Sequence, residues 1–220
     1  MKRFALIAFC ACAAFAATAA PAGAGGECRS LPVCVPVAGP WVLTGAQEVE
    51  FQLACPRKFV IGGLDADISV RGVSVGFRGA LGAPVNPGIT TSRSVVFLGR
   101  LVKAANRTPS FRPRIGCIPG GAGQRVPTSV RAEPTSTLRV TQIAVLPGLQ
   151  RYALRCPAKQ RLAGATHAIA FYLPAPPTAQ LAGSVGVAQS IRDGRVYVTV
   201  RGAPELHGVR AIVQVDLVCA

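Results

Sequence analysis

One stretch of the chain carries the pattern of a hydrolase nucleophile. Residues 72–76, GVSVG, match Gly-x-Ser-x-Gly, and Ser74 is followed by Asp193 and His207 in the chain order of an α/β-hydrolase triad. In that chemistry His207 takes the proton of Ser74 while Asp193 orients the imidazole. The motif needs a helix directly after its sharp turn, whereas FRGALGAPVNPG follows Gly76 and cannot form one. A small secreted serine hydrolase therefore stays an alternative hypothesis.

Two further groups of side chains suggest ligand chemistry. Asp65 and Asp67, in GLDADIS, have the spacing for a Ca²⁺ site completed by backbone carbonyls, or for the two acids of a glycosidase. A β-turn with two exposed carboxylates is the simpler interpretation. His167 and His207 stand alone, and Cys-x-x-Cys spacing does not occur. The sequence thus predicts no metal site and no cofactor.

The first residues predict where the protein works. Two basic residues precede an apolar run that ends near Ala20, and small residues follow, which is the layout of a secretory signal peptide. We expect cleavage after Ala24, which removes residues 1–24. No later stretch is apolar enough to span a bilayer, so the mature chain should have no transmembrane segment. We expect a secreted or extracellular protein and leave association with the cell envelope open.

The cysteines predict disulfide bonds. Removal of the signal peptide takes 2 of the 8 cysteines and leaves 6, an even number that in an exported chain indicates three bonds. Two pairs have almost the same separation, 62 and 63 residues, and the third pair is close in sequence. The simplest connectivity is Cys55–Cys117, Cys156–Cys219 and Cys28–Cys34, although six cysteines allow 15 pairings.

The chain contains one phrase twice. FQLACPRKFVIGG, residues 51–63, and YALRCPAKQRLAG, residues 152–164, lie 101 positions apart. The same offset aligns Val95 with Val196, and one residue of slippage brings the last two cysteines opposite each other. This correspondence predicts a tandem repeat.

Each half has the pattern of antiparallel β-structure. In EVEFQLAC, Val49, Phe51 and Leu53 fall on one face while Glu50 and Gln52 fall on the other, as in a half-buried strand. RYALRC, RVYVTVR and VRAIVQVDLVC alternate in the same way. The sequence predicts an all-β protein of two similar antiparallel β-sandwich or barrel-like domains, each held by a disulfide.

The predicted organisation follows from these patterns and from the Pro- and Gly-rich breaks between them. An N-terminal segment with the Cys28–Cys34 bridge covers residues 25–45, and the lone Trp41 within it should pack over the core. The remaining boundaries are a first β domain at 46–118, a Pro/Gly-rich linker at 119–138 and a second β domain at 139–220.

CPAKQRLAG, followed by the closing VQVDLVCA, resembles a repeat of secreted actinobacterial proteins in which a Cys-Pro-x-Gly/Lys phrase leads to a Gly-rich turn and a final Cys-Ala strand. The likeness covers residues 150–220 well and 47–118 less well. Ala163 replaces one glycine of the usual Gly-Gly turn, and PRK at 56–58 lacks the family glycine. The resemblance implies an exported β module with no assigned chemistry and transfers no functional residue.

The charge of the chain allows two interpretations. The net charge of +15 falls to +13 when Lys2 and Arg3 leave with the signal peptide, and 20 of the 24 basic residues are arginine. A positive field would attract anionic envelope polymers, whereas a GC-rich genome produces arginine without selection for a basic surface. Tight basic runs and interleaved aromatics are lacking, which disfavours nucleic acid.

The function expected from these patterns is a secreted, non-enzymatic binding or structural module of the cell envelope or extracellular space. The chain devotes its residues to strands, turns and cysteines, with few ionisable groups that could converge. The serine hydrolase is one alternative. A basic protein that binds anionic envelope polymers is the other.

Overall fold

The computed structural model describes residues 26–79, 93–120 and 137–220. The predicted signal peptide, most of the predicted linker and the Pro/Gly-rich stretch after Gly79 lie outside these residues. Within them the chain is all-β, as the sequence predicted, and its strands pair antiparallel in several sheets. None of the helices in these ranges has the length and apolar character needed to cross a bilayer.

The first half begins with a short 3₁₀ turn and continues in strands. These elements are η1 (Gly26–Cys28), β1 (Val35–Ala38), β2 (Trp41–Leu43), β3 (Val49–Ala54), β4 (Phe59–Ile68), β5 (Val73–Gly79), β6 (Ser94–Leu101) and β7 (Ser110–Pro119). The sequence did not predict β1 and β2, which lie in the segment expected to precede the first domain.

The second half adds six strands and two short helical turns. They are β8 (Thr137–Ala144), β9 (Gly148–Arg155), β10 (Leu162–Phe171), α1 (Ala179–Gly183), β11 (Val185–Arg192), β12 (Arg195–Gly202), η3 (Pro204–Leu206) and β13 (Ala211–Cys219). The side chain of Thr178 caps α1 by accepting a hydrogen bond from the Leu181 N–H.

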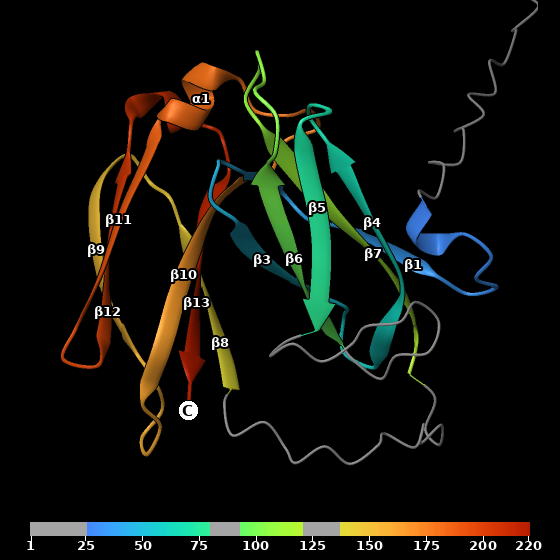
Figure 1. Ribbon diagram of the computed structural model, residues 1–220, viewed down its shortest axis with the longest axis horizontal. Helices are drawn as coiled ribbons and strands as arrows, with labels where there is room; N and C mark the ends of the chain where they lie inside the picture. Colours follow the sequence, from blue (N-terminus) through green and yellow to red (C-terminus); the bar gives the residue numbers. More distant parts are fainter. Residues whose placement is uncertain (1–25, 80–92, 121–136) are drawn as a thin grey trace, which may run out of the picture.

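The strands form layers that are stacked across the molecule (Figure 1). The large sheet has the order β1-β7-β2-β10-β13-β8, with β4 on β7. The central sheet, β3-β6-β5, lies between the β4–β7 part and the β10–β13 part of the large sheet. The outer sheet consists of β11 paired with β12, and β9 packs beside β12. The two predicted domains are thus layers of one stack rather than separate bodies.

Strand β2 joins the two halves. Val42 pairs with Phe111 of β7 on one side and with Ala170 of β10 on the other, so the large sheet runs through both halves. Trp41 in the same strand is buried, as the sequence predicted.

Each half has its own apolar core between two sheets. In the first half Phe51 and Phe97 of the central sheet pack with Phe111 of β7, and the Phe97 and Phe111 rings stack with centroids 6.5 Å apart. In the second half the valines of β12 pack with alternate residues of β13, among them Val198 and Val215. Burial of these side chains supplies the main force that holds the layers together.

All three predicted disulfides are formed, and the 15 possible pairings reduce to the simplest one. Cys28 bonds Cys34. In each half a further bond joins the cysteine after the first repeated strand to the last strand, as Cys55–Cys117 and Cys156–Cys219. Such bonds form and persist in oxidising compartments.

The alternation predicted for β9, β12 and β13 is confirmed by the residues that pack in the core of the second half, but the other face of β13 is not exposed. Strand β13 is buried on both faces, and even the polar side chains of Gln214 and Asp216 are only 1% exposed. The reason is tertiary: one face of β13 contacts the core of the second half, while the other lies under the central sheet of the first half.

The strand pairings of the two halves follow corresponding registers. In each half the second repeated strand pairs with the last strand, and a register shift lies one residue beyond the position opposite the cysteine. The lysine three residues after the repeated cysteine, Lys58 in the first half and Lys159 in the second, adopts a positive φ of 71° and 74° respectively. The paired positions are Ile61 with Cys117 and Gly63 with Gly116 in the first half, and Leu162 with Cys219 and Gly164 with Val218 in the second.

Candidate functional site

The structure does not assemble the hydrolase triad. Ser74 is an exposed residue inside strand β5, opposite Arg100 of β6, and no helix follows it there. Asp193 lies in the turn that joins β11 to β12, and His207 follows η3 beyond the opposite end of β12. The length of β12 alone separates these two residues by about 25 Å. Proton transfer among the three side chains is therefore excluded in this fold.

The predicted acid pair lies in a strand and not in a turn, so that part of the interpretation is wrong. Asp65 and Asp67 belong to β4 and point to the same face of it. Asp65 Oδ2 accepts a hydrogen bond from the Gly26 N–H at 2.9 Å, and Asp67 Oδ2 lies 3.3 Å from Arg114 Nη1. Within the described ranges no three His, Cys, Asp or Glu side chains cluster as metal ligands do.

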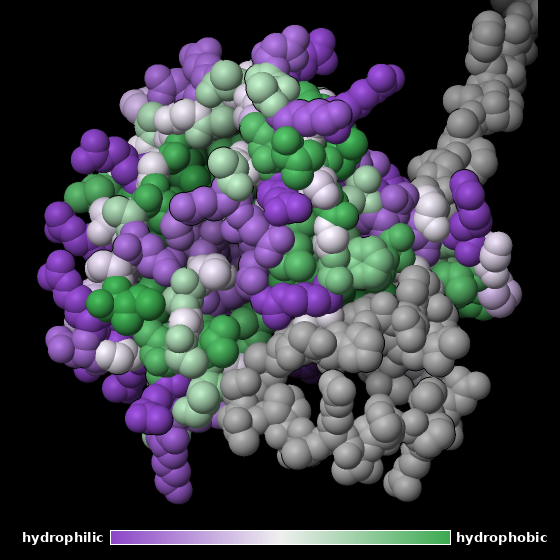
Figure 2. Space-filling model, viewed as in Figure 1, coloured by the Kyte–Doolittle hydropathy of each residue, from purple (hydrophilic) through white to green (hydrophobic). Residues whose placement is uncertain are grey.

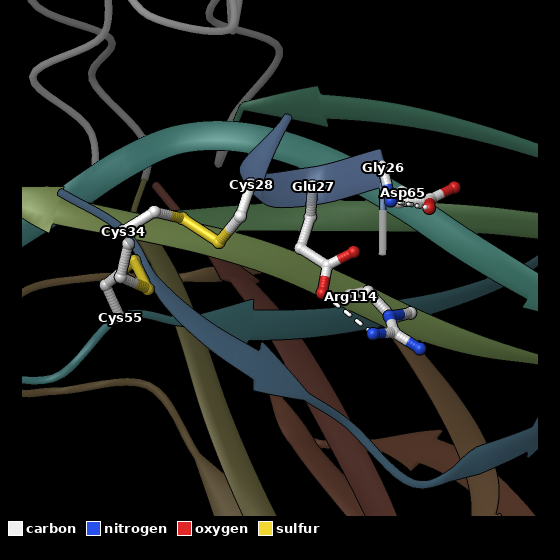
Figure 3. The surroundings of a disulfide bond; sticks show 8 residues. Gly26, Glu27, Cys28, Cys34, Cys55, Asp65 and Arg114 are labelled. Carbon is white, nitrogen blue, oxygen red and sulfur yellow. Dashed lines mark hydrogen bonds and ion pairs between the residues drawn. A yellow bond between two sulfur atoms is a disulfide. The ribbon is translucent and has the colours of Figure 1, made fainter. Parts of the chain in front are cut away.

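These acids help to hold the N-terminal clasp, which we define as residues 26–34 (Figure 3). Glu27 is 1% exposed, and its Oε1 accepts a hydrogen bond from Arg114 Nη2 at 2.8 Å. This hydrogen bond and the charge of the carboxylate raise the pKa of Arg114. The clasp thereby covers the outer face of β4 and β7.

Two glycines make room for the clasp. Gly63 and Gly116 are paired in β4 and β7, and a Cβ atom on either would overlap the backbone carbonyl oxygen of Glu27. The repeated Gly63 therefore serves close packing. At the corresponding Gly164 a Cβ would meet no atom within 4 Å.

A polar cluster lies where the second half packs on the first. Asp216 Oδ2 accepts a hydrogen bond from Gln214 Nε2 at 3.3 Å, while no described residue donates to its Oδ1. The nearby central sheet contributes the ion pair of Arg78 with Glu50, 2.6 Å long. Burial raises the pKa of Asp216 to about 7, and the charge of Glu50 also raises it. The contact between the halves thus contains a group that titrates near neutral pH.

The outer sheet presents a face of a different kind. Along β12 the buried Val196, Val198 and Val200 point inward, so that alternate residues point to solvent. Tyr152 and Leu154 of β9 pack against the same core, which places the residues that alternate with them, among them Arg151 and Arg155, on that solvent side too. The arginine face, as we call it, consists of Arg151 and Arg155 of β9, Arg192 of β11, and Arg195, Tyr197 and Arg201 of β12.

All five arginines of this face are exposed, and Tyr197 is 38% exposed. Strands β9, β11 and β12 contain no acidic residue, and none of the ion pairs among the described residues involves these arginines. Figure 2 shows hydrophilic side chains along the left rim of the molecule, where these strands lie in Figure 1. The face is therefore positive and exposed to solvent.

The corresponding face of the first half has a different composition and is covered. At the offset of 101 residues, Tyr197 corresponds to Val96, which is 0% exposed beneath the second half. Arg151 corresponds to Glu50, which pairs with Arg78 in the contact between the halves. Val96 and Glu50 thus lie on the covered part of this face, where the free face has Tyr197 and Arg151, whereas Arg201 corresponds to another exposed arginine, Arg100.

The chemistry of the arginine face is that of anion recognition. A guanidinium group donates several N–H bonds in a fixed plane, which suits phosphate, sulfate and carboxylate oxygens. Five such groups spread over one exposed sheet face suit an extended ligand with repeated charges better than a small enclosed one. Sequence reasoning missed this face because its arginines come from three strands and alternate with apolar residues.

Comparison of the chain with protein-family models, with curated proteins and with solved structures found no match.

Proposed function

We propose that the protein is an exported, non-enzymatic binding module that attaches to anionic polymers of the cell envelope or its surroundings through the arginine face. The observation that carries the proposal is the gathering of five exposed arginines on one sheet face with no carboxylate in its strands. Export is supported by the signal-peptide pattern and by the three disulfides.

We further propose that the two halves are copies of one unit. The support is the repeated phrase, the equal register shifts opposite Cys117 and Cys219, and the positive φ of both lysines. In such a stack each unit has two outer faces, and only those at the ends stay uncovered. The clasp covers one end. The arginine face is the other end, which makes it the natural contact for a ligand.

The type of polymer follows from charge and from the aromatic ring. Binding of a polyanion to several arginines releases its condensed counterions, so the affinity falls steeply with salt. Tyr197 lies among the arginines of β12 and offers a ring on which an apolar ligand surface can pack. The arginines favour a polymer with repeated negative charges, and the Tyr197 ring favours one that also has apolar surface. Together they favour a charged glycan polymer over an inorganic polyanion.

Replacement of Arg151, Arg195 and Arg201 by glutamine is expected to weaken binding to dextran sulfate at least tenfold at 0.1 M salt. The slope of log affinity against log salt should become shallower by about 2 to 3, one for each lost contact. Titration calorimetry or fluorescence anisotropy at several salt concentrations measures both quantities.

The matched control replaces Arg57, Arg71 and Arg107 by glutamine. These residues are also exposed and lie in the first half, and their replacement removes the same net charge. Their loss should lower the affinity less than threefold, because long-range attraction alone is screened by salt. Equal effects of the two triple variants would mean that net charge, and not the arginine face, governs binding.

A further inference from the structure

A groove opens at the edge of the second half, between β8 and β9. Its volume is about 480 Å³, and Arg139 of β8 and Arg155 of β9 line it together with Leu154, Cys156 and Pro157. Arg155 also belongs to the arginine face, so the groove begins where that face ends. Unlike the face, it is concave and partly apolar.

Arg139 lies on the wall of this groove and is exposed. Its Nη1 donates a hydrogen bond to the backbone carbonyl of Arg155 at 3.3 Å, which ties the guanidinium to strand β9. A single bond leaves the other N–H donors of the guanidinium free for a ligand. No carboxylate of the described residues lies within ion-pair distance of Arg139 or Arg155. The charged part of the lining is two arginines, for which the described residues supply no counter-ion.

The groove is not a general consequence of the fold. Arg139 of β8 pairs with Leu217, two residues before Cys219. Val37 of β1 pairs with Ile115, two residues before Cys117, so Val37 is the first-half position that corresponds to Arg139. At the offset of 101 residues Ala54 corresponds to Arg155. Both arginines are thus specific to the second half, while the cysteine and proline of the groove, Cys156 and Pro157, occur in both.

We propose that this groove binds a phosphate monoester whose organic part carries an apolar segment. Two guanidinium groups balance the two negative charges of the dianion and can donate to its oxygens. Leu154 and Pro157 give the apolar segment a surface to cover. The site goes beyond polymer binding because it needs one dianionic group and not a chain of charges.

The test is an NMR titration of the oxidised full-length mature protein with octyl phosphate, below its micelle concentration, and with inorganic phosphate. Amide shifts should concentrate at residues 137–140 and 153–158, and octyl phosphate should bind at least tenfold more tightly than inorganic phosphate. Octyl sulfate, with the same tail and one charge fewer, should bind at least fivefold more weakly than octyl phosphate. Equal affinity for the two octyl compounds would overturn the dianion assignment.

Arg139→Gln should lower the affinity for octyl phosphate at least tenfold, whereas Arg192→Gln removes the same charge from the arginine face and should change it less than twofold. Both residues are exposed, so an unchanged amide spectrum elsewhere can verify the fold of each variant. An unaffected Arg139→Gln variant would refute the site. Dextran sulfate binding tests the arginine face, and octyl phosphate binding tests the groove. Either proposal can therefore be refuted while the other is supported.

Discussion

Replacement of Cys156 and Cys219 by alanine is expected to lower the free energy of unfolding by about 4 kcal/mol. The bond closes a loop of 63 residues, and its loss lets the unfolded chain explore many more conformations. Cys219 is also fully buried in the core of the second half, where alanine leaves a small cavity. Urea unfolding of the oxidised protein, followed by circular dichroism, measures the change.

The three disulfides should differ in a definite order. The Cys55–Cys117 bond closes a loop of nearly the same length and should contribute a similar amount. The Cys28–Cys34 bond spans only 6 residues, and its removal should cost about 2 kcal/mol. If the short bond proved as important as the long ones, loop closure would not be the source of their stabilisation.

Asp216→Asn is expected to stabilise the protein at pH 8 and to remove much of its pH dependence. The carboxyl has a pKa of about 7 in the folded chain because it is buried, and near 3.9 in the unfolded chain. The folded state therefore holds the proton more tightly. The contribution of Asp216 to stability is therefore highest below about pH 4, falls as the pH rises to about 7, and is constant above it, with a total loss on the order of 4 kcal/mol.

The difference in unfolding free energy between Asp216→Asn and the parent protein measures this effect directly. It should be small at pH 4, grow by up to about 1.4 kcal/mol per pH unit, and level off above pH 7. Asp193→Asn, at an exposed turn position, is the matched control and should keep the pH dependence of the parent. A difference that does not change with pH would show that Asp216 is already ionised in the folded protein.

The strands with one buried face could be predicted from the sequence. Strands β3, β9 and β12 alternate because one side contacts a core and the other contacts solvent or polar groups, and this leaves a period of two in the residue types. The long-range disulfides could be predicted as well, because the spacing of the cysteines repeats. Their pairing needed the structure, since spacing alone does not exclude the other connectivities.

The stacking of the halves could not be predicted. Strands β1 and β2 are four and three residues long, too short for a periodic pattern, and proline occurs in and beside them. Gln214 and Asp216 look like solvent-facing residues, because nothing local to β13 indicates that another sheet covers them. Contacts between the halves, such as that of Val42 with Ala170, join residues more than 100 positions apart, which a local pattern does not contain.

The arginine face could not be predicted from the sequence either. In the sequence its arginines are separated by apolar residues and by whole strands, so they resemble the even scatter of a GC-rich composition. The fold gathers them because alternate residues of neighbouring strands share one face. The same alternation places Glu50 and Val96 on the covered face of the first half. The two faces thus differ at two of the corresponding positions, where Arg151 and Tyr197 replace Glu50 and Val96.

The most direct test of the arginine face is an amide chemical-shift map of the protein during titration with a short sulfated oligosaccharide. The largest shifts should fall on β9, β11 and β12, with the Tyr197 ring resonances shifting as well, and added salt should reverse them. Shifts concentrated on β4, β7 and the N-terminal clasp, or spread evenly over the molecule, would contradict a binding role for this face.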